Sequence, residues 1–175
     1  MEYLQVFNKD KKALDEKVLR EDKYKLPDGK YFMIVLIFIM NSEGKFLMQK
    51  TSKSRNSCIA TTGGHVSYGD TGLITVFKEA KEELGLDLDT NEIQYIDTLI
   101  FKNGIEETYF VNKDIDINTL TIQKEEVDYV EWFTVDEIKE LINKKEFREG
   151  NIDAFYKVLD YIQKKIGWKS NLFLL

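Results

Sequence analysis

Residues 60–86 have the sequence ATTGGHVSYGDTGLITVFKEAKEELGL, and this stretch decides the fold. From Thr71 onward apolar residues recur at helical spacing, and Gly85 stands where a helix would end. We therefore predict a helix from 71 to 84. Its predicted apolar face carries Leu73, Val76, Phe77, Ala80 and Leu84. The preceding residues 63–70 are rich in glycine and predict a loop whose backbone can approach a ligand closely.

Three carboxylates cluster on the predicted helix. Glu79, Glu82 and Glu83 stand at i, i+3 and i+4, so they project from one face, which lies beside the apolar stripe and not within it. Neighbouring carboxylates repel each other, and their oxygens suit hard cations such as Mg²⁺ and Mn²⁺. An acidic helix face taken alone is more often solvated surface. The three glutamates alone therefore suggest a metal site only as a hypothesis, which needs support from other residues.

The rest of the chain predicts a sheet. An almost unbroken apolar run from Tyr31 to Met40 is typical of a strand buried on both faces. Further strands are predicted from Phe46 onward and at 93–101, 105–111 and 127–133, with hairpin turns at 41–44 and 103–104. A capping-box pattern at Thr134 and Glu137 predicts a short helix to 142, and a last helix follows from about 152 to 166. This order predicts an α/β (α+β) fold, a mixed sheet with helices packed on it.

Length and composition restrict the function. The 175 residues fit a single domain, with residues 1–30 as an N-terminal hairpin extension. The longest apolar run, 32–40, has about half the length that a bilayer requires, so we expect no membrane role. A net charge of −6 with interleaved lysines disfavours nucleic acid, although divalent cations would still allow an anionic substrate. A single cysteine and the absence of a signal-peptide pattern predict a cytoplasmic protein.

Residues 64–86 resemble the Nudix box. The family pattern is Gly, five residues, Glu, seven residues, then Arg-Glu-aliphatic-x-Glu-Glu-x-Gly-aliphatic, and this sequence keeps every spacing. The two departures are Asp70 in place of Glu and Lys78 in place of Arg. The N-terminal hairpin, residues 46–50, and residues 123–127 before Trp132-Phe133 resemble the Nudix group related to isopentenyl-diphosphate isomerase.

The resemblance implies a Nudix-type α/β/α sandwich with a mixed β-sheet. It also implies a hydrolase that uses Mg²⁺ or Mn²⁺ and water to cleave a small-molecule diphosphate, such as a nucleoside diphosphate derivative. The implied metal ligands are Glu79 and Glu83. Glu82 would bridge the metal through water or pair with Lys78. Substrate contact is implied at Gly63, Gly64 and His65, with one of the glycines offering a carbonyl to the metal.

The general base of such enzymes is often a glutamate on a late loop. Glu126 is our candidate and Glu125 the second choice, because both directly precede the strand predicted at 127. The alternative, to which we give equal weight, is that Glu125 and Glu126 only stand at a strand end in solvent and have no catalytic role. Glu106 and Glu107 come next. His65, the only histidine, would bind metal or substrate as a similarly placed histidine does in the isomerase branch, or it would simply pack in its loop.

Two other functions remain open. A non-catalytic Nudix-fold module that binds a nucleotide is one, although degenerate boxes usually lose the Glu-Glu pair that this box keeps. An isopentenyl-diphosphate isomerase is the other, but that reaction needs a cysteine where this chain has Gly63. Cys58 is predicted to be a small buried hydrophobe and Trp132 to lie in the core. The apolar tail 172–175 needs cover, which a homodimer would provide.

Overall fold

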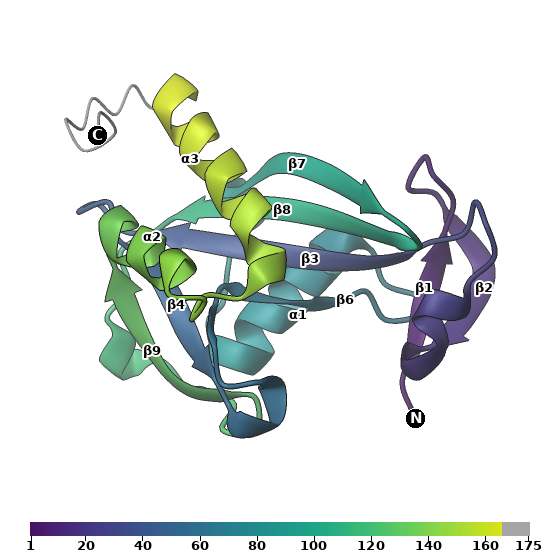
Figure 1. Ribbon diagram of the computed structural model, residues 1–175, viewed down its shortest axis with the longest axis horizontal. Helices are drawn as coiled ribbons and strands as arrows, with labels where there is room; N and C mark the ends of the chain where they lie inside the picture. The colour runs from purple at the N-terminus through teal and green to yellow at the C-terminus, as the bar shows by residue number, and fades with distance from the viewer. Residues whose placement is uncertain (166–175) are drawn as a thin grey trace.

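A long strand, β3 (Phe32–Met40), runs through the middle of the computed structural model, which describes residues 1–165 (Figure 1). Its alternate side chains enter two separate cores, as the two-residue period of a strand requires. Leu36, Phe38 and Met40 face helices α2 (Val135–Asn143) and α3 (Ile152–Lys165). Val35, Ile37 and Ile39 face helix α1 (Gly72–Leu84). The prediction of a strand buried on both faces is confirmed.

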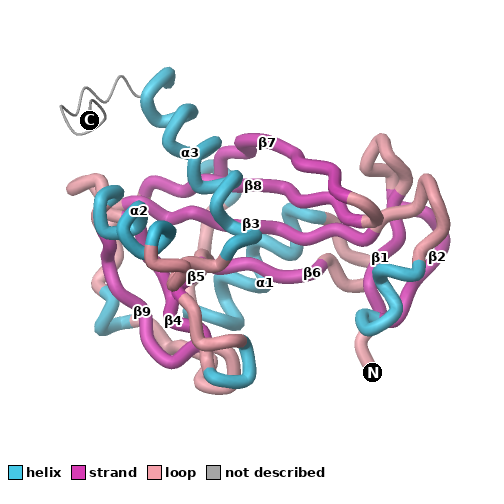
Figure 2. The backbone as a smooth tube through the Cα atoms, in the orientation of Figure 1, coloured by secondary structure: helices cyan, strands magenta, loops and turns pink. Residues whose placement is uncertain are grey.

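The sheet around β3 is mixed. β3 pairs in parallel with β8 and antiparallel with β4 and β6, and the strand order is β5-β4-β3-β8-β7, with β6 beside β3 and β9 beside β4. The strands are β4 (Phe46–Thr51), β5 (Ile59–Ala60), β6 (Thr62–His65), β7 (Ile93–Phe101), β8 (Gly104–Asn112) and β9 (Val127–Phe133). Figure 2 shows the helices on both sides of these strands, with α1 behind and α2 and α3 in front. The predicted mixed α+β sandwich is therefore confirmed.

Helix α1 has the predicted ends. The Thr71 side chain accepts a hydrogen bond from the Ile74 N–H, and Gly85 ends the helix with φ of +67°. The predicted apolar face is wrong at Leu73, which is 37% exposed. Gly72 faces the sheet instead, where a Cβ atom would lie 2.3 Å from the Glu107 carboxylate. The buried row accordingly follows i, i+4 spacing through Gly72, Val76, Ala80 and Leu84.

The other two helices also follow their sequence signals. Thr134 and Glu137 form the predicted capping box of α2, and α3 buries Phe155, Leu159 and Ile162. The predicted end of α3 at Ile166 and the apolar tail 172–175 lie outside the described residues. No helix within residues 1–165 has the length and hydropathy needed to cross a membrane.

The predicted glycine-rich loop is partly wrong, because its first residues form a strand. Residues Thr62–His65 make up β6 and pair with Ile34–Ile37 of β3. A glycine pair has little strand propensity of its own, so its pairing depends on the neighbouring strand. A Cβ atom on Gly63 would lie 2.2 Å from the Val35 carbonyl oxygen, so this close approach requires glycine. The loop itself begins at Val66.

The predicted N-terminal hairpin is present, and it packs against the main sheet. Strands β1 (Tyr3–Phe7) and β2 (Ala13–Leu19) pair with each other and lead into a 3₁₀ helix, η1 (Arg20–Lys25), which the sequence analysis did not predict. The Gln5 N–H donates to the Val66 carbonyl at 3.0 Å, and the Gly69 N–H donates to the Gln5 side chain at 3.1 Å. Lys11 pairs with Glu107 of β8 at 2.8 Å. These contacts fix the hairpin beside the loop that leads to α1.

We expect Gly63→Ala to lower the free energy of unfolding by about 1–3 kcal/mol, because the added methyl group has no room against β3. Urea unfolding followed by circular dichroism measures this loss. Gly150→Ala is the matched control, because a Cβ atom there meets no heavy atom within 4 Å. Equal unfolding midpoints for the two variants would show that the β3–β6 contact is looser than described.

Candidate active site

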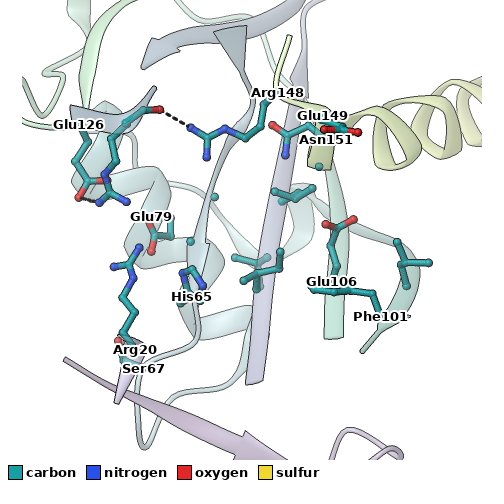
Figure 3. Close-up of a pocket in the computed structure, with 18 of the residues that line it drawn as sticks. Arg20, His65, Ser67, Glu79, Phe101, Glu106, Glu126, Arg148, Glu149 and Asn151 are labelled. Carbon is teal, nitrogen blue, oxygen red and sulfur yellow. Dashed lines mark hydrogen bonds and ion pairs between the residues drawn. The ribbon is translucent and has the colours of Figure 1, made fainter. Parts of the chain in front are cut away.

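A cavity of about 700 Å³ opens beside strands β3 and β6 (Figure 3). Its walls include Gly63, Gly64 and His65 of β6, Glu79 and Glu82 of α1, and residues of β7, β8 and the two segments that precede β3 and β9. The volume lies within the range of small-molecule sites. The cavity brings together the glycines, the histidine and two of the three box glutamates, all of which the sequence analysis had proposed.

Glu79 and Glu83 of α1 point toward the β6 glycines. Glu83 is 4% exposed, and its Oε2 accepts hydrogen bonds from the Gln49 side chain at 3.1 Å and from the Gly63 N–H at 3.2 Å. The Glu79 carboxylate packs against Gly64, where a Cβ atom would lie 1.9 Å from Oε1. A side chain at residue 64 would therefore displace this carboxylate.

The predicted location of the glutamates on a face beside the apolar stripe is wrong for Glu83, which is buried. The two donors, Gln49 and Gly63, replace the water that this carboxylate gives up. Glu82 is exposed at the edge of the cavity. Glu83 is thus buried, Glu79 half-buried and Glu82 exposed.

The two inner carboxylates carry unusual electrostatics. Burial, together with the charges of Glu82 and Glu126, raises the pKa of Glu79 to about 7. Burial and the charge of Glu79 raise the pKa of Glu83 to about 8, against the effect of its hydrogen bonds. The Glu79 carboxylate has no hydrogen-bond or ion-pair partner among residues 1–165. Buried, mutually repelling carboxylates are an environment that a divalent cation would relieve.

The donor set fits Mg²⁺ or Mn²⁺ if other ligands complete the coordination shell. No group of three or more His, Cys, Asp or Glu side chains within residues 1–165 is arranged to hold a metal ion by itself. Mg²⁺ is typically held by one or two carboxylates, with water and substrate phosphate oxygens as further ligands. Glu79 and Glu83 would supply the carboxylates, and the backbone of β6 lies next to both.

His65 lies in the cavity wall and is half-buried. Its ring is 5.7 Å from the ring of Phe32, and burial next to cationic side chains lowers its pKa to about 3. The imidazole is therefore neutral near pH 7, and one ring nitrogen is free of a proton. A neutral ring can accept a hydrogen bond or bind a metal, and it can also serve as packing against Phe32.

Only one of the two base candidates lies in the site. Glu126 lines the cavity, and its Oε1 pairs with Arg55 Nη2 at 2.5 Å. Glu125 is exposed and is absent from the cavity wall, and its main-chain carbonyl accepts from Ser52 Oγ at 2.9 Å. Both residues belong to the turn that precedes β9, and only the Glu126 side chain is turned toward the cavity.

The two reserve candidates for the general base, Glu106 and Glu107, face opposite sides of the sheet. Glu106 lines the cavity and is 5% exposed, and burial near Asp153 raises its pKa to about 7. Glu107 faces the opposite side of the sheet, where it pairs with Lys11 and accepts from the Tyr109 hydroxyl at 2.6 Å. Glu106 is thus the reserve base within reach of the cavity.

The two departures from the box pattern contact each other. Lys78 Nζ pairs with Asp70 Oδ2 at 2.6 Å. Of the two alternatives for Glu82, the pairing with Lys78 is not found, because the Asp70 carboxylate holds the ammonium group, and the contact with a metal through water stays a prediction. Lys78 does not line the cavity. Cys58 and Trp132 also lie outside this cavity wall and are half-buried, so neither is as deeply buried as predicted.

The sequence analysis missed the arginines. Arg20, Arg55 and Arg148 all line the cavity, and Figure 3 shows Arg20 beside Glu79 and His65. They are the only three arginines among the 25 basic residues of the chain. The composition offered one signal that could have identified them. Where all other basic residues are lysines, each arginine is a candidate for a site that needs a planar guanidinium group.

Comparison with known proteins agrees with this fold. The family model described as the NUDIX domain matches residues 30–155. The chain therefore belongs to the Nudix family. The match begins after the N-terminal hairpin, so the hairpin and η1 lie outside the family domain.

Individual relatives are distant. A Nudix hydrolase of Listeria innocua is 28% identical over 151 residues, which cover 84% of this chain and 88% of the relative. Nudix hydrolase 3 of Arabidopsis thaliana is 27% identical over 158 residues, which cover 79% of this chain but 20% of that protein. A crystal structure of a Deinococcus radiodurans protein superposes with a TM-score of 0.70 at 20% identity, covering 89% of this chain and 97% of that one. This last similarity is one of fold.

The raised pKa of Glu83 predicts that the metal-free protein loses stability as the pH rises. The folded state binds the proton more tightly than the unfolded state, so this contribution is complete below the ordinary pKa of 4.5 and is lost as the pH rises through about 8. We expect Glu83→Gln, which keeps a neutral side chain, to become progressively more stable than the wild type across this window. Urea midpoints measured in EDTA from pH 5 to 8.5 test this. Glu131→Gln on exposed β9 should show no such trend.

Proposed function

We propose that this protein is a metal-dependent hydrolase that cleaves the diphosphate linkage of a nucleoside diphosphate derivative or a similar small molecule. The observation that carries the proposal is the pair of buried carboxylates, Glu79 and Glu83, set against the β6 glycines at the wall of a cavity of small-molecule size. Membership of the Nudix family supports the hydrolase class.

Glu79 and Glu83 would hold Mg²⁺ or Mn²⁺, and exposed Glu82 would contact the ion through water. A bound divalent ion neutralises phosphate charge and acidifies water. The hydrogen bonds that Gln49 and Gly63 donate to Glu83 fix one ligand in a defined orientation. Lys78 would act indirectly, since its ion pair with Asp70 joins the loop to the first turns of α1.

Glu126 is the proposed general base. Arg55 binds its Oε1 at 2.5 Å, which orients the carboxylate and leaves Oε2 as the oxygen that can take a proton from the attacking water. The negative charge of Glu126 also raises the pKa of Glu79 and of Glu83, as a carboxylate close to this pair would. Glu125 has no such relation to the cavity.

Two observations bear on the alternatives. The isomerase would require a thiol at residue 63, and a Cβ atom there would lie 2.2 Å from the Val35 carbonyl oxygen, so even a first side-chain atom is not accommodated. A non-catalytic nucleotide-binding module would not need two desolvated carboxylates beside the cavity, and keeping them buried costs stability. Both points favour the hydrolase. The direct experiment is a phosphate-release screen over nucleoside diphosphate derivatives with Mg²⁺ or Mn²⁺, in which an added phosphatase frees phosphate from the two phosphomonoester products.

We expect Glu83→Gln to remove nearly all turnover while the variant still folds, because the amide keeps the hydrogen bonds but not the charge. In the wild type, Mg²⁺ or Mn²⁺ should raise the melting temperature, since the ion binds the folded state alone. Glu83→Gln should lose most of that increase. Phosphate release and thermal unfolding measure the two effects. Full turnover by the wild type in excess EDTA would rule out the proposed metal dependence.

We expect Glu126→Gln to lower kcat by about a hundredfold or more with a nearly unchanged metal-induced rise in melting temperature, as removal of a general base should. Glu125→Gln is the matched control and should keep the wild-type rate. If Glu126→Gln instead raised KM alone, the residue would serve only to orient Arg55. Full rate in both variants would move the assignment to Glu106.

A further inference from the structure

All three arginines of the chain line the same cavity, although they come from distant parts of the sequence. Arg20 begins η1, Arg55 ends the short 3₁₀ helix η2 (Lys53–Arg55), and Arg148 directly precedes a third 3₁₀ segment, η5 (Glu149–Asn151). The chain has a net charge of −6 and exposes lysine elsewhere. Seven acidic residues line the same cavity, so an anion would bind at the guanidinium groups themselves and not across the whole cavity.

Each arginine uses only part of its hydrogen-bonding capacity on the protein. Arg20 Nη1 pairs with Glu2 at 2.7 Å, Arg55 Nη2 pairs with Glu126 at 2.5 Å, and Arg148 Nη2 donates to the Arg55 carbonyl at 3.3 Å. A guanidinium has five N–H donors, so most remain available. The side chains of Arg20 and Arg55 are about one-third exposed, at 33% and 35%, which leaves them accessible from the cavity.

Arg148 provides a second, independent observation. Its Nε is buried without a hydrogen-bond partner, alone among the side-chain nitrogen and oxygen atoms of residues 1–165. Leaving a charged donor unsatisfied costs stability, and such groups usually mark a missing ligand or water. Figure 3 shows the Arg148 side chain extending over the cavity toward Glu126. A phosphate oxygen is an acceptor of the right kind, and it would reach this shielded Nε only if the guanidinium group shifted on binding.

Figure 3 shows Glu106 and Phe101 at the end of the cavity away from Arg20. Glu106 and Asp153 lie there, close enough for Asp153 to raise the pKa of Glu106, next to the apolar side chains Leu99 and Phe101. Carboxylates would repel an additional phosphate and would accept hydrogen bonds from hydroxyl or amino groups. The charge pattern therefore orients a substrate with its diphosphate at the arginines and its organic part toward Phe101.

We infer that Arg20 is a substrate-binding residue that joins Arg55 and Arg148 in holding the diphosphate, so that the N-terminal extension forms one wall of the substrate site. This inference rests on the proposed diphosphate hydrolysis and adds the residues that recognise the substrate. Arg20 lies outside the matched family domain at 30–155, yet the docking of the hairpin on Val66 and Gly69 fixes it over β6. The extension and the family domain thus act as one functional unit.

The test is calorimetric titration of the full-length protein with methylenediphosphonate, a diphosphate analogue that is not hydrolysed, in the presence of Mg²⁺. We expect Arg20→Ala to weaken binding by about tenfold or more, the loss typical of a charge-assisted hydrogen bond. Lys25→Ala is the matched control, because it removes one positive charge from the same 3₁₀ helix at a side chain that is 79% exposed and outside the cavity wall. It should bind within about twofold of the wild type.

A second variant separates recognition from folding. Glu2→Gln breaks the same Glu2–Arg20 ion pair but keeps the guanidinium, so it should bind as tightly as the wild type or more tightly. Equal losses in Arg20→Ala and Glu2→Gln would mean that the ion pair only holds the hairpin, and would overturn the inference. Unchanged binding in Arg20→Ala would overturn it as well.

The phosphate-release screen, run on the same variants, distinguishes this inference from the proposed function. Turnover by the wild type with an unchanged KM in Arg20→Ala would overturn the role of Arg20 and leave the hydrolase intact. Binding of methylenediphosphonate that depends on Arg20, without turnover of any diphosphate, would support the recognition site and overturn the hydrolase alone.

Discussion

The burial of the Glu83 carboxylate is the constraint on which the rest of this site depends. A carboxylate that is 4% exposed is stable only because Gln49 on β4 and the Gly63 N–H on β6 both donate to it. Those donors require α1, β4 and β6 to meet at one point. The meeting in turn requires glycine at residue 63, since a side chain there would collide with the Val35 carbonyl oxygen, whereas a side chain at residue 64 would displace the Glu79 carboxylate. The residues of the box therefore allow α1 to pack closely against β6, in addition to providing candidate metal ligands.

The electrostatics of the cavity follow from the same packing. Glu79 and Glu83 are close, desolvated and repelling, so the pKa of each lies well above its ordinary value. Arg20 and Arg55 lie in the same cavity and offset part of this charge, because both act to lower the pKa of Glu79. A cavity that holds carboxylates and guanidinium groups together suits a bound cation and a bound anion, which is the charge arrangement of a metal-assisted reaction on a phosphate.

Much of the fold could be predicted from local signals. The helix at 72–84 followed from its cap residues and period, and β3 followed from an apolar run too continuous for a one-sided strand. The incorrect predictions concern residues whose conformation depends on contact with a segment distant in sequence. Residues 63–65 are predicted to be a loop from their composition, but they form a strand because β3 offers an edge to pair with. Leu73 turns outward because Gly72 allows the closer approach to Glu107.

The helix, its three carboxylates, the adjacent glycines and hence the family are recognisable without a structure, because these features lie within 27 consecutive residues at fixed spacings. Only the tertiary structure decided which glutamate is buried, which of Glu125 and Glu126 faces the cavity, and that Arg20, Arg55 and Arg148 share it. The physical reason is that spacing along a helix defines a face, whereas burial and the convergence of distant side chains depend on which surfaces pack together. No local pattern encodes the meeting of residues 20, 55 and 148.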